Sequence, residues 1–142
     1  VKRIIKDSEG KVKLVLRYAP FHQGADYFVK ILEAAKKQDK YWETLDVMFK
    51  TQSYWASHHN PQPDKIWQFL PRAGLDLDKL KKDMEDPAIA AIIEQDMADA
   101  KALNVRKTPG FFVNGKPLQT FGARQLLQLI QAEMAEQYPD MG

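Results

Sequence analysis

The stretch VRKTPGFFVNGKPL, residues 105–118, constrains the fold of this chain more than any other. It places a Thr-Pro step shortly before the apolar residues 111–113, and an Asn-Gly pair follows them at once. Asn-Gly is the strongest short hairpin signal, because both residues tolerate the positive φ of a type I′ turn. Proline has no amide hydrogen but is accepted at the first position of a strand. The stretch therefore predicts an antiparallel hairpin with Pro109 at its mouth.

Apolar residues in the rest of the chain recur with two different periods. Residues 12–18 alternate between two sides of the chain, which predicts a strand with one firmly buried face. Residues 24–103 show helical spacing instead, and a further helical pattern follows the hairpin. This order predicts an α/β chain. We expect residues 1–23 and 104–142 to form its sheet-containing part, and residues 24–103 to be a helical insertion.

Two helical patterns within the insertion carry specific expectations. Trp42, Leu45 and Phe49 are spaced to form the core-facing stripe of one helix. Asp96 lies near the apolar face of another, which leaves two interpretations. It is either a partly exposed residue at the edge of that face, or a buried carboxylate with a raised pKa that serves as a proton relay.

The composition limits the chemistry of this chain. It has no cysteine, which excludes disulfides, thiolate metal sites and a cysteine nucleophile from it. Its formal net charge of +2 is too small to indicate a nucleic acid or an anionic membrane surface as partner. No apolar run approaches the roughly 20 residues of a membrane span. At 142 residues the chain is long enough to bury a core.

Two segments resemble a known family. VRKTPGFFVNGKPL followed by FGARQLLQLI resembles the last part of a thioredoxin-type domain, in the DsbA-like branch of thiol–disulfide oxidoreductases. VKLVLRYAPFHQGADYFVKILEAAKKQDKYWETLDVMF resembles the strand and first inserted helix that follow the active-site helix in that branch. The matches occur in the right order around a helical block. The resemblance implies a thioredoxin-like fold, here incomplete, with an inserted α-helical subdomain.

The resemblance also implies a substrate-binding site. Thr108 and Pro109 correspond to the loop that lies against the reactive disulfide and holds the substrate backbone, and Gly110 stands where a larger residue is commoner. Spacing alone does not choose between an ordinary trans bond before Pro109 and a cis bond that turns the backbone of Thr108 outward for strand addition. His22 is expected near the same surface, where it contacts substrate or makes a structural hydrogen bond.

The residues that carry the family's redox step are missing from the sequence. The usual Cys-x-x-Cys opens a helix whose tail resembles residues 1–6, so we expect this chain to be a fragment that lacks the preceding strand and the motif. Two alternatives remain: a redox-inactive binding module, and a relative of the kappa-type glutathione transferases or isomerases. We expect no catalytic residue and no cofactor. His58 and His59 are interpreted as part of a solvated loop, so no metal site is expected.

The resemblance sets the expected partners and location. It implies cysteine-containing protein substrates that dock through their backbone, in the periplasm or otherwise outside the cytoplasm. Without the strand that lies between residues 12–18 and 111–113 in the family, the sheet would have a gap with unpaired backbone groups. We expect that gap to be filled in one of three ways: the two strands pair directly, a second copy of the chain completes the sheet, or the missing strand remains bound.

Overall fold

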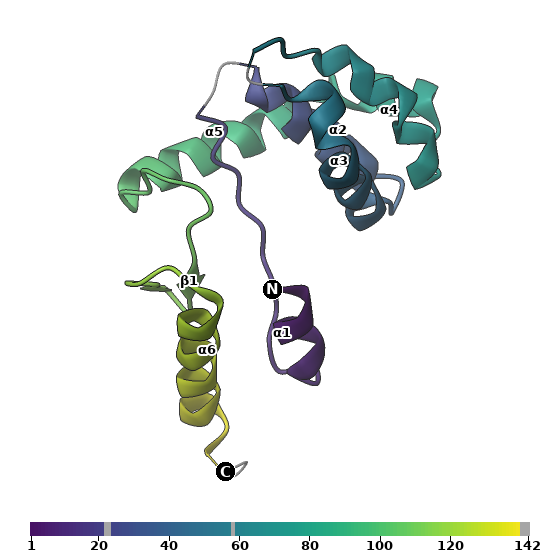
Figure 1. The fold of residues 1–142 in the computed structure, drawn as a ribbon. Coiled ribbons are helices and arrows are strands. Elements are labelled where there is room, and N and C mark those ends of the chain that lie inside the picture. Colours follow the sequence, from purple (N-terminus) through teal and green to yellow (C-terminus); the bar gives the residue numbers. More distant parts are fainter. Residues whose placement is uncertain (22–23, 58, 140–142) are drawn as a thin grey trace. The chain divides into compact units, whose positions relative to one another are not determined.

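The structure, a computed structural model, describes residues 1–21, 24–57 and 59–139. It divides into two units, one formed by Val1–Arg17 with Ala100–Gly142 and the other by Tyr18–Asp99. The first unit contains helix α1 (Lys2–Asp7), a β-hairpin and helix α6 (Ala123–Gln137), and the second is helical (Figure 1). The division into residues 1–23 with 104–142 and an insertion at 24–103 stays a prediction.

The hairpin forms as the sequence predicts, except that its first strand begins at Phe112 and not at Pro109, which lies in the preceding loop. Strand β1 (Phe112–Val113) pairs antiparallel with strand β2 (Lys116–Pro117), and Phe112 lies opposite Pro117. The residues between the strands, Asn114 and Gly115, have φ values of 49° and 81°, as a type I′ turn requires. The backbone N–H of Leu118 donates to the carbonyl of Phe111 at 2.9 Å and extends the pairing.

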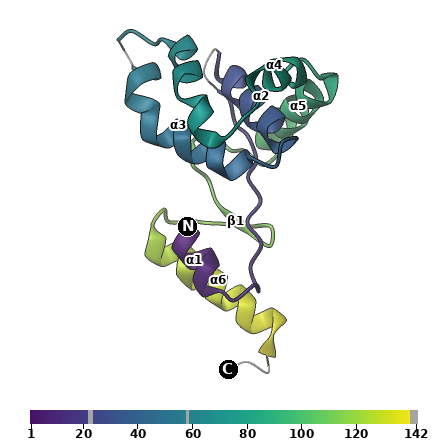
Figure 2. The same ribbon diagram turned by 90° about the vertical axis from the view of Figure 1, so that its right-hand side faces the viewer.

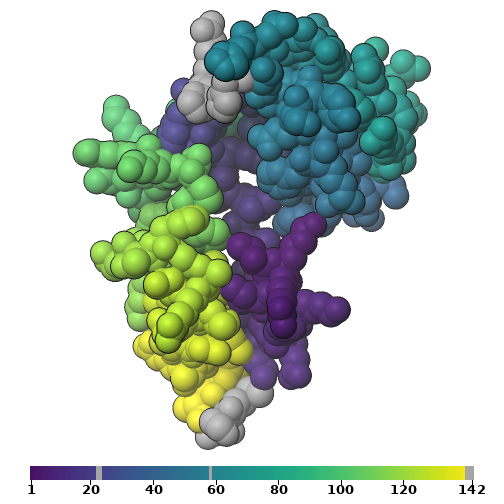
Figure 3. Space-filling model, in the orientation of Figure 1, coloured from purple at the N-terminus to yellow at the C-terminus, as the bar shows by residue number. Residues whose placement is uncertain are grey.

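Helix α6 supports this hairpin from one side. It contacts β1, and Figure 2 shows the two elements next to each other. In the space-filling view the residues of α6, coloured from yellow-green to yellow, form one continuous surface (Figure 3). Leu126 and Ile130 of α6 are buried. A two-stranded hairpin is only marginally stable by itself, so its position depends on this helix.

The strand predicted over residues 12–18 is not formed. These residues have no regular structure, and the only sheet in the described part of the chain is the β1–β2 pair. Residues 12–16 make no backbone hydrogen bond to any described residue, and the side chain of Val15 is 62% exposed. Direct pairing with residues 111–113, one of the three expected ways to fill the gap in the sheet, is therefore not formed. An alternating sequence forms a ladder only when a neighbouring strand supplies donors and acceptors.

The helical unit surrounds one apolar core. It contains α2 (Ala25–Lys36), α3 (Tyr41–Trp55), two 3₁₀ helices η1 (Pro63–Gln68) and η2 (Leu70–Ala73), α4 (Leu77–Asp83) and most of α5 (Pro87–Ala102). Helix α3 packs against α2 and both 3₁₀ helices, and α4 packs against α2. The most completely buried apolar side chains of this core are Ile31, Ile66, Leu70 and Leu80.

Helix α3 buries a different face from the one predicted. Trp42 and Phe49 are exposed, whereas Thr44, Thr51 and Trp55 lie on the buried side. The buried hydroxyls are satisfied locally. Thr44 donates to the carbonyl of Lys40 at 2.6 Å, and Thr51 donates to that of Val47 at 2.7 Å. The indole N–H of Trp55 then donates to Thr51 Oγ1 at 3.1 Å. Because each hydroxyl finds an acceptor one turn back, threonine can occupy the core side.

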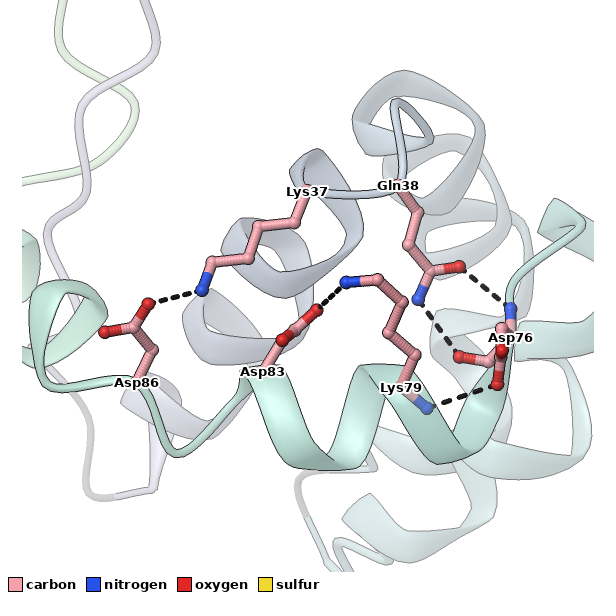
Figure 4. Close-up of polar contacts among 6 residues, drawn as sticks. All are labelled: Lys37, Gln38, Asp76, Lys79, Asp83 and Asp86. Carbon is pink, nitrogen blue, oxygen red and sulfur yellow. Dashed lines mark hydrogen bonds and ion pairs between the residues drawn. The ribbon is translucent and has the colours of Figure 1, made fainter.

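Polar contacts hold the loops between helices in this unit (Figure 4). The side-chain amide of Gln38 donates to the carbonyl of Asp76 at 3.0 Å and accepts from the N–H of Asp76 at 2.9 Å. Asp76 also caps α4, where its carboxylate accepts from the N–H of Lys79 at 3.1 Å. Lys37 forms an ion pair with Asp86. The end of α2 is thereby tied to the segments that precede α4 and α5.

The core position of Ile31 can be tested by removing its side chain beyond Cβ. Ile31 is fully buried, so Ile31→Ala leaves a cavity and should lower the free energy of unfolding by about 2–5 kcal/mol. Phe49→Ala on the exposed face should change it by no more than about 0.5 kcal/mol. Urea unfolding followed by tryptophan fluorescence measures both, because all three tryptophans belong to the helical unit. Equal effects of the two variants would contradict this account of the core.

Candidate functional site

The predicted docking residues lie in an exposed loop between α5 and β1. Thr108, Pro109 and Gly110 are all exposed, and the Thr108–Pro109 peptide bond is cis. Neither the backbone N–H nor the carbonyl of Thr108 forms a hydrogen bond within the part of the chain that the structure describes. An exposed residue with an unpaired donor and acceptor can bind the backbone of an extended peptide.

This loop is anchored at both of its ends. On the α5 side, the N–H of Val105 donates to the carbonyl of Ala100 at 2.8 Å, and the chain turns at Asn104 with a φ of 58°. On the other side the loop runs directly into β1. The two anchors fix where the loop begins and ends, while its own polar groups stay accessible to solvent.

Gly110 is not required by the folding of this loop. A Cβ built on Gly110 would meet the carbonyl oxygen of Lys107 at 3.7 Å and Cγ1 of Val105 at 3.9 Å, which are ordinary contacts. Its φ lies outside the left-handed region. An alanine therefore fits the folded chain at this position, and any need for glycine there must come from something that approaches the loop.

The remaining predicted contact cannot be placed. His22 lies outside the described residues, and so does His58. Among the described residues, no group of three or more His, Cys, Asp or Glu side chains is arranged to hold a metal ion.

A buried carboxylate that the sequence interpretation missed connects the hairpin to α6. Glu133 of α6 is 6% exposed. It accepts a hydrogen bond from the side-chain amide of Asn114 at 3.2 Å and forms an ion pair with Lys116. Sequence spacing offered a signal, because Glu133 follows Leu126 by two helical turns and Ile130 by one, and so lies on the buried stripe of α6.

These contacts shift the pKa values of Glu133 and Lys116. The hydrogen bond from Lys116, followed by that from Asn114, lowers the pKa of Glu133 below its ordinary value of 4.5. The hydrogen bond to Glu133 raises the pKa of Lys116 above its ordinary value of 10.5. The pair is therefore charged throughout the neutral range.

A second polar cluster lies in the helical unit. The backbone N–H of Tyr18 donates to Asp96 Oδ2 at 2.9 Å, and its hydroxyl lies 2.9 Å from Glu33 Oε1 and 2.6 Å from the Tyr41 hydroxyl. Burial, followed by the contact with Tyr41, raises the pKa of Tyr18, which keeps the phenol protonated. Asp96 is buried, so the interpretation as a partly exposed residue is wrong. In this arrangement its carboxylate holds the backbone of Tyr18.

Comparison with known protein families gives one match over most of the chain. The profile of a family described as Thioredoxin matches residues 1–132. Among curated proteins, the Na(+)/H(+) antiporter NhaA of Herminiimonas arsenicoxydans is 29% identical over 122 residues, which cover 85% of this chain. The Na(+)/H(+) antiporter NhaA 3 of Salinispora tropica is 32% identical over 108 residues, or 74% of this chain. The matched regions make up 19% and 16% of these two relatives.

A solved structure matches the fold. The crystal structure of a thioredoxin-like oxidoreductase from Silicibacter pomeroyi DSS-3 superposes with a TM-score of 0.70 at 25% sequence identity. The match covers 95% of this chain and 79% of that one. The fold is therefore thioredoxin-like, with an incomplete sheet and a helical insertion, as predicted. None of the helices in residues 1–21, 24–57 and 59–139 combines the length and apolar character that crossing a bilayer requires.

The contribution of Glu133 to stability should decrease as the pH falls. Because its pKa in the folded chain is below 4.5, stabilisation by the ionised carboxylate is complete above pH 4.5 and is lost as the pH falls through the lower value. Glu133→Gln should therefore destabilise α6 and the hairpin at pH 7, and the difference from the original chain should shrink toward pH 3. Hydrogen-exchange protection of the α6 amides measures this, since the unit has no tryptophan.

Glu136→Gln provides a matched control for that experiment. Glu136 lies 3.6 Å from the same Lys116 ammonium, but its side chain is 65% exposed. Its substitution should have little effect at either pH, because exposed ion pairs contribute little. If both variants lowered protection equally, burial of Glu133 would not be what makes its contact important.

Proposed function

This chain belongs to the thioredoxin family, and we propose that it is part of a protein thiol–disulfide oxidoreductase of the DsbA-like type, in which it docks the substrate. The observation that carries the proposal is the exposed Thr108 in the loop before β1, whose backbone donor and acceptor have no partner among the described residues. The structural likeness to a thioredoxin-like oxidoreductase supports it. As part of the same proposal, we place the whole protein outside the cytoplasm.

Docking proceeds by addition of an extended peptide to the loop. The N–H of Thr108 donates to a carbonyl of the substrate backbone, and the carbonyl of Thr108 accepts from a substrate N–H. These contacts involve no side chain of the substrate, so they suit many sequences that share one extended conformation. The substrate's cysteine is thereby held at a fixed distance from the loop.

The redox step needs sulfur atoms from outside this chain. Thiol–disulfide exchange requires a thiolate that attacks a disulfide sulfur and releases a second thiolate, and this chain has no cysteine. We propose that the reactive pair belongs to a preceding segment of the longer protein. The same segment, or a second copy of the chain, would supply the strand that residues 12–16 lack.

A second candidate is a redox-inactive binding domain within a longer transport protein. The two curated relatives named as Na(+)/H(+) antiporters favour it, because the chain spans less than a fifth of each of them. In this case the loop around Thr108 binds an extended segment without any later chemistry. A Cys-x-x-Cys in the preceding segment would favour the oxidoreductase, and its absence would favour the binding domain.

The chain alone should not reduce disulfides. With no thiol it cannot form the mixed disulfide, so adding it to insulin and dithiothreitol should leave the rate of insulin precipitation unchanged. Turbidity measures the rate, and a protein without cysteine at the same concentration serves as the control. A rate that rises with the concentration of this chain would contradict the assignment of the sulfur chemistry to another segment.

A substitution at Gly110 can separate the docking role of the loop from its contribution to stability. Gly110→Ala should raise the free energy of unfolding by about 0.4–1 kcal/mol, since the folded loop accepts a Cβ and the unfolded chain loses entropy. It should at the same time weaken binding of an extended Val/Thr peptide with a central S-methylcysteine, because the added methyl group obstructs its approach. NMR titration, followed on the amides of Thr108 and residue 110, measures the affinity.

Gly10→Ala should give the opposite pattern. Gly10 has a φ of 81°, so an alanine there is strained although no atom lies within 4 Å of the new Cβ. This variant should be less stable and should bind the peptide as the original chain does. If peptide affinity followed stability in both variants, or if no peptide bound near Thr108, the proposed docking site would be wrong.

A further inference from the structure

Charge is divided unevenly between the two units. Val1–Arg17 and Ala100–Gly142 hold 11 basic and 5 acidic residues, whereas Tyr18–Asp99 holds 10 basic and 14 acidic ones. The unit that carries Thr108 therefore has a formal net charge of +6, although that of the whole chain is only +2. Such an excess on one unit attracts partners of the opposite charge.

The positive charge includes two uncompensated side chains next to the docking loop. Residues 100–132 contain no Asp or Glu and hold five basic residues: Lys101, Arg106, Lys107, Lys116 and Arg124. Lys116 is neutralised by Glu133. The Arg106 Nε donates to the neutral amide oxygen of Asn104 at 3.0 Å, and Lys107 has no ion pair with any residue in the described ranges. Arg106 and Lys107 are both exposed.

We infer that Arg106 and Lys107 make the docking loop selective for extended peptides with acidic residues beside the docked segment. The inference rests on the proposed function and names its substrate class. An extended chain advances about 3.3 Å per residue, so the Cα atoms of Arg106 and Lys107 lie within about 7 Å of that of Thr108. A peptide paired with Thr108 places its flanking side chains within reach of both.

A peptide fits this surface better than another polyanion does. The two cations directly precede Thr108, whose backbone donor and acceptor have no partner in the described part of the chain, and Phe112, four residues after Thr108, is 41% exposed. An acidic extended peptide can satisfy the charges and the backbone groups and can cover the aromatic ring. A phosphate of a lipid surface or a nucleic acid is an acceptor only, so its contact with the two cations would leave the Thr108 carbonyl without a donor.

The test compares two peptides on the full chain at low and high salt. One has two Asp residues on each side of a central Val-Thr-Val-Thr segment, and the other has Asn at those four positions. NMR titration of the Thr108 amide should show affinity about three- to tenfold higher for the Asp peptide at low salt, with the difference lost at high salt. Arg106→Glu with Lys107→Glu should remove this preference and leave binding of the Asn peptide unchanged.

Arg3→Glu with Lys6→Glu in α1 makes the same change in net charge within the same unit. This control variant should keep the preference for the Asp peptide. If the variant lost the preference, the assignment to residues 106 and 107 would be overturned.

On the original chain, equal affinity for both peptides would overturn the selectivity and leave the docking loop intact. Failure of both peptides to bind would overturn the docking function itself. Binding to phosphatidylserine vesicles that displaces the Asp peptide would assign the charge to a membrane surface instead.

Discussion

The contact that positions the hairpin is the one that Glu133 makes with the two residues on either side of Gly115. Each strand has only two residues, so backbone pairing alone holds the hairpin weakly. Asn114 and Lys116 both reach the same buried carboxylate on α6, and this attaches the turn to the helix. The start of β1, and with it the end of the docking loop, takes its position from this attachment.

The loop before β1 combines a fixed position with unoccupied polar groups. The hydrogen bond from Val105 to Ala100 fixes its first end, and the hairpin fixes its second. Between these anchors Thr108 makes no backbone hydrogen bond to the described residues. A loop that satisfied its own polar groups would be more stable but would have nothing to offer a peptide. The arrangement therefore leaves the energetic gain of pairing to a binding partner.

The sequence predicted best what depends on neighbouring residues. The Asn-Gly hairpin and the helices formed, because turn chemistry and helical hydrogen bonds are local. The strand at residues 12–18 did not, because a ladder needs a partner that periodicity alone cannot supply. The face of α3 was misjudged because Thr44 and Thr51 satisfy their hydroxyls within the helix. Glu133 was missed because a charged residue on an apolar stripe has meaning only once Lys116 is placed opposite it.

The net charge misled for a related reason. A formal charge of +2 for the whole chain suggests no strong electrostatic preference, but it is the difference between a basic and an acidic unit. Electrostatic attraction between exposed groups is screened over about 10 Å at ordinary salt, so a partner responds to the charge near its own site. At the docking loop that charge is the pair Arg106 and Lys107, and the first acidic residue after them in the sequence is Glu133. Charge therefore has to be counted by folded unit before it can indicate a partner.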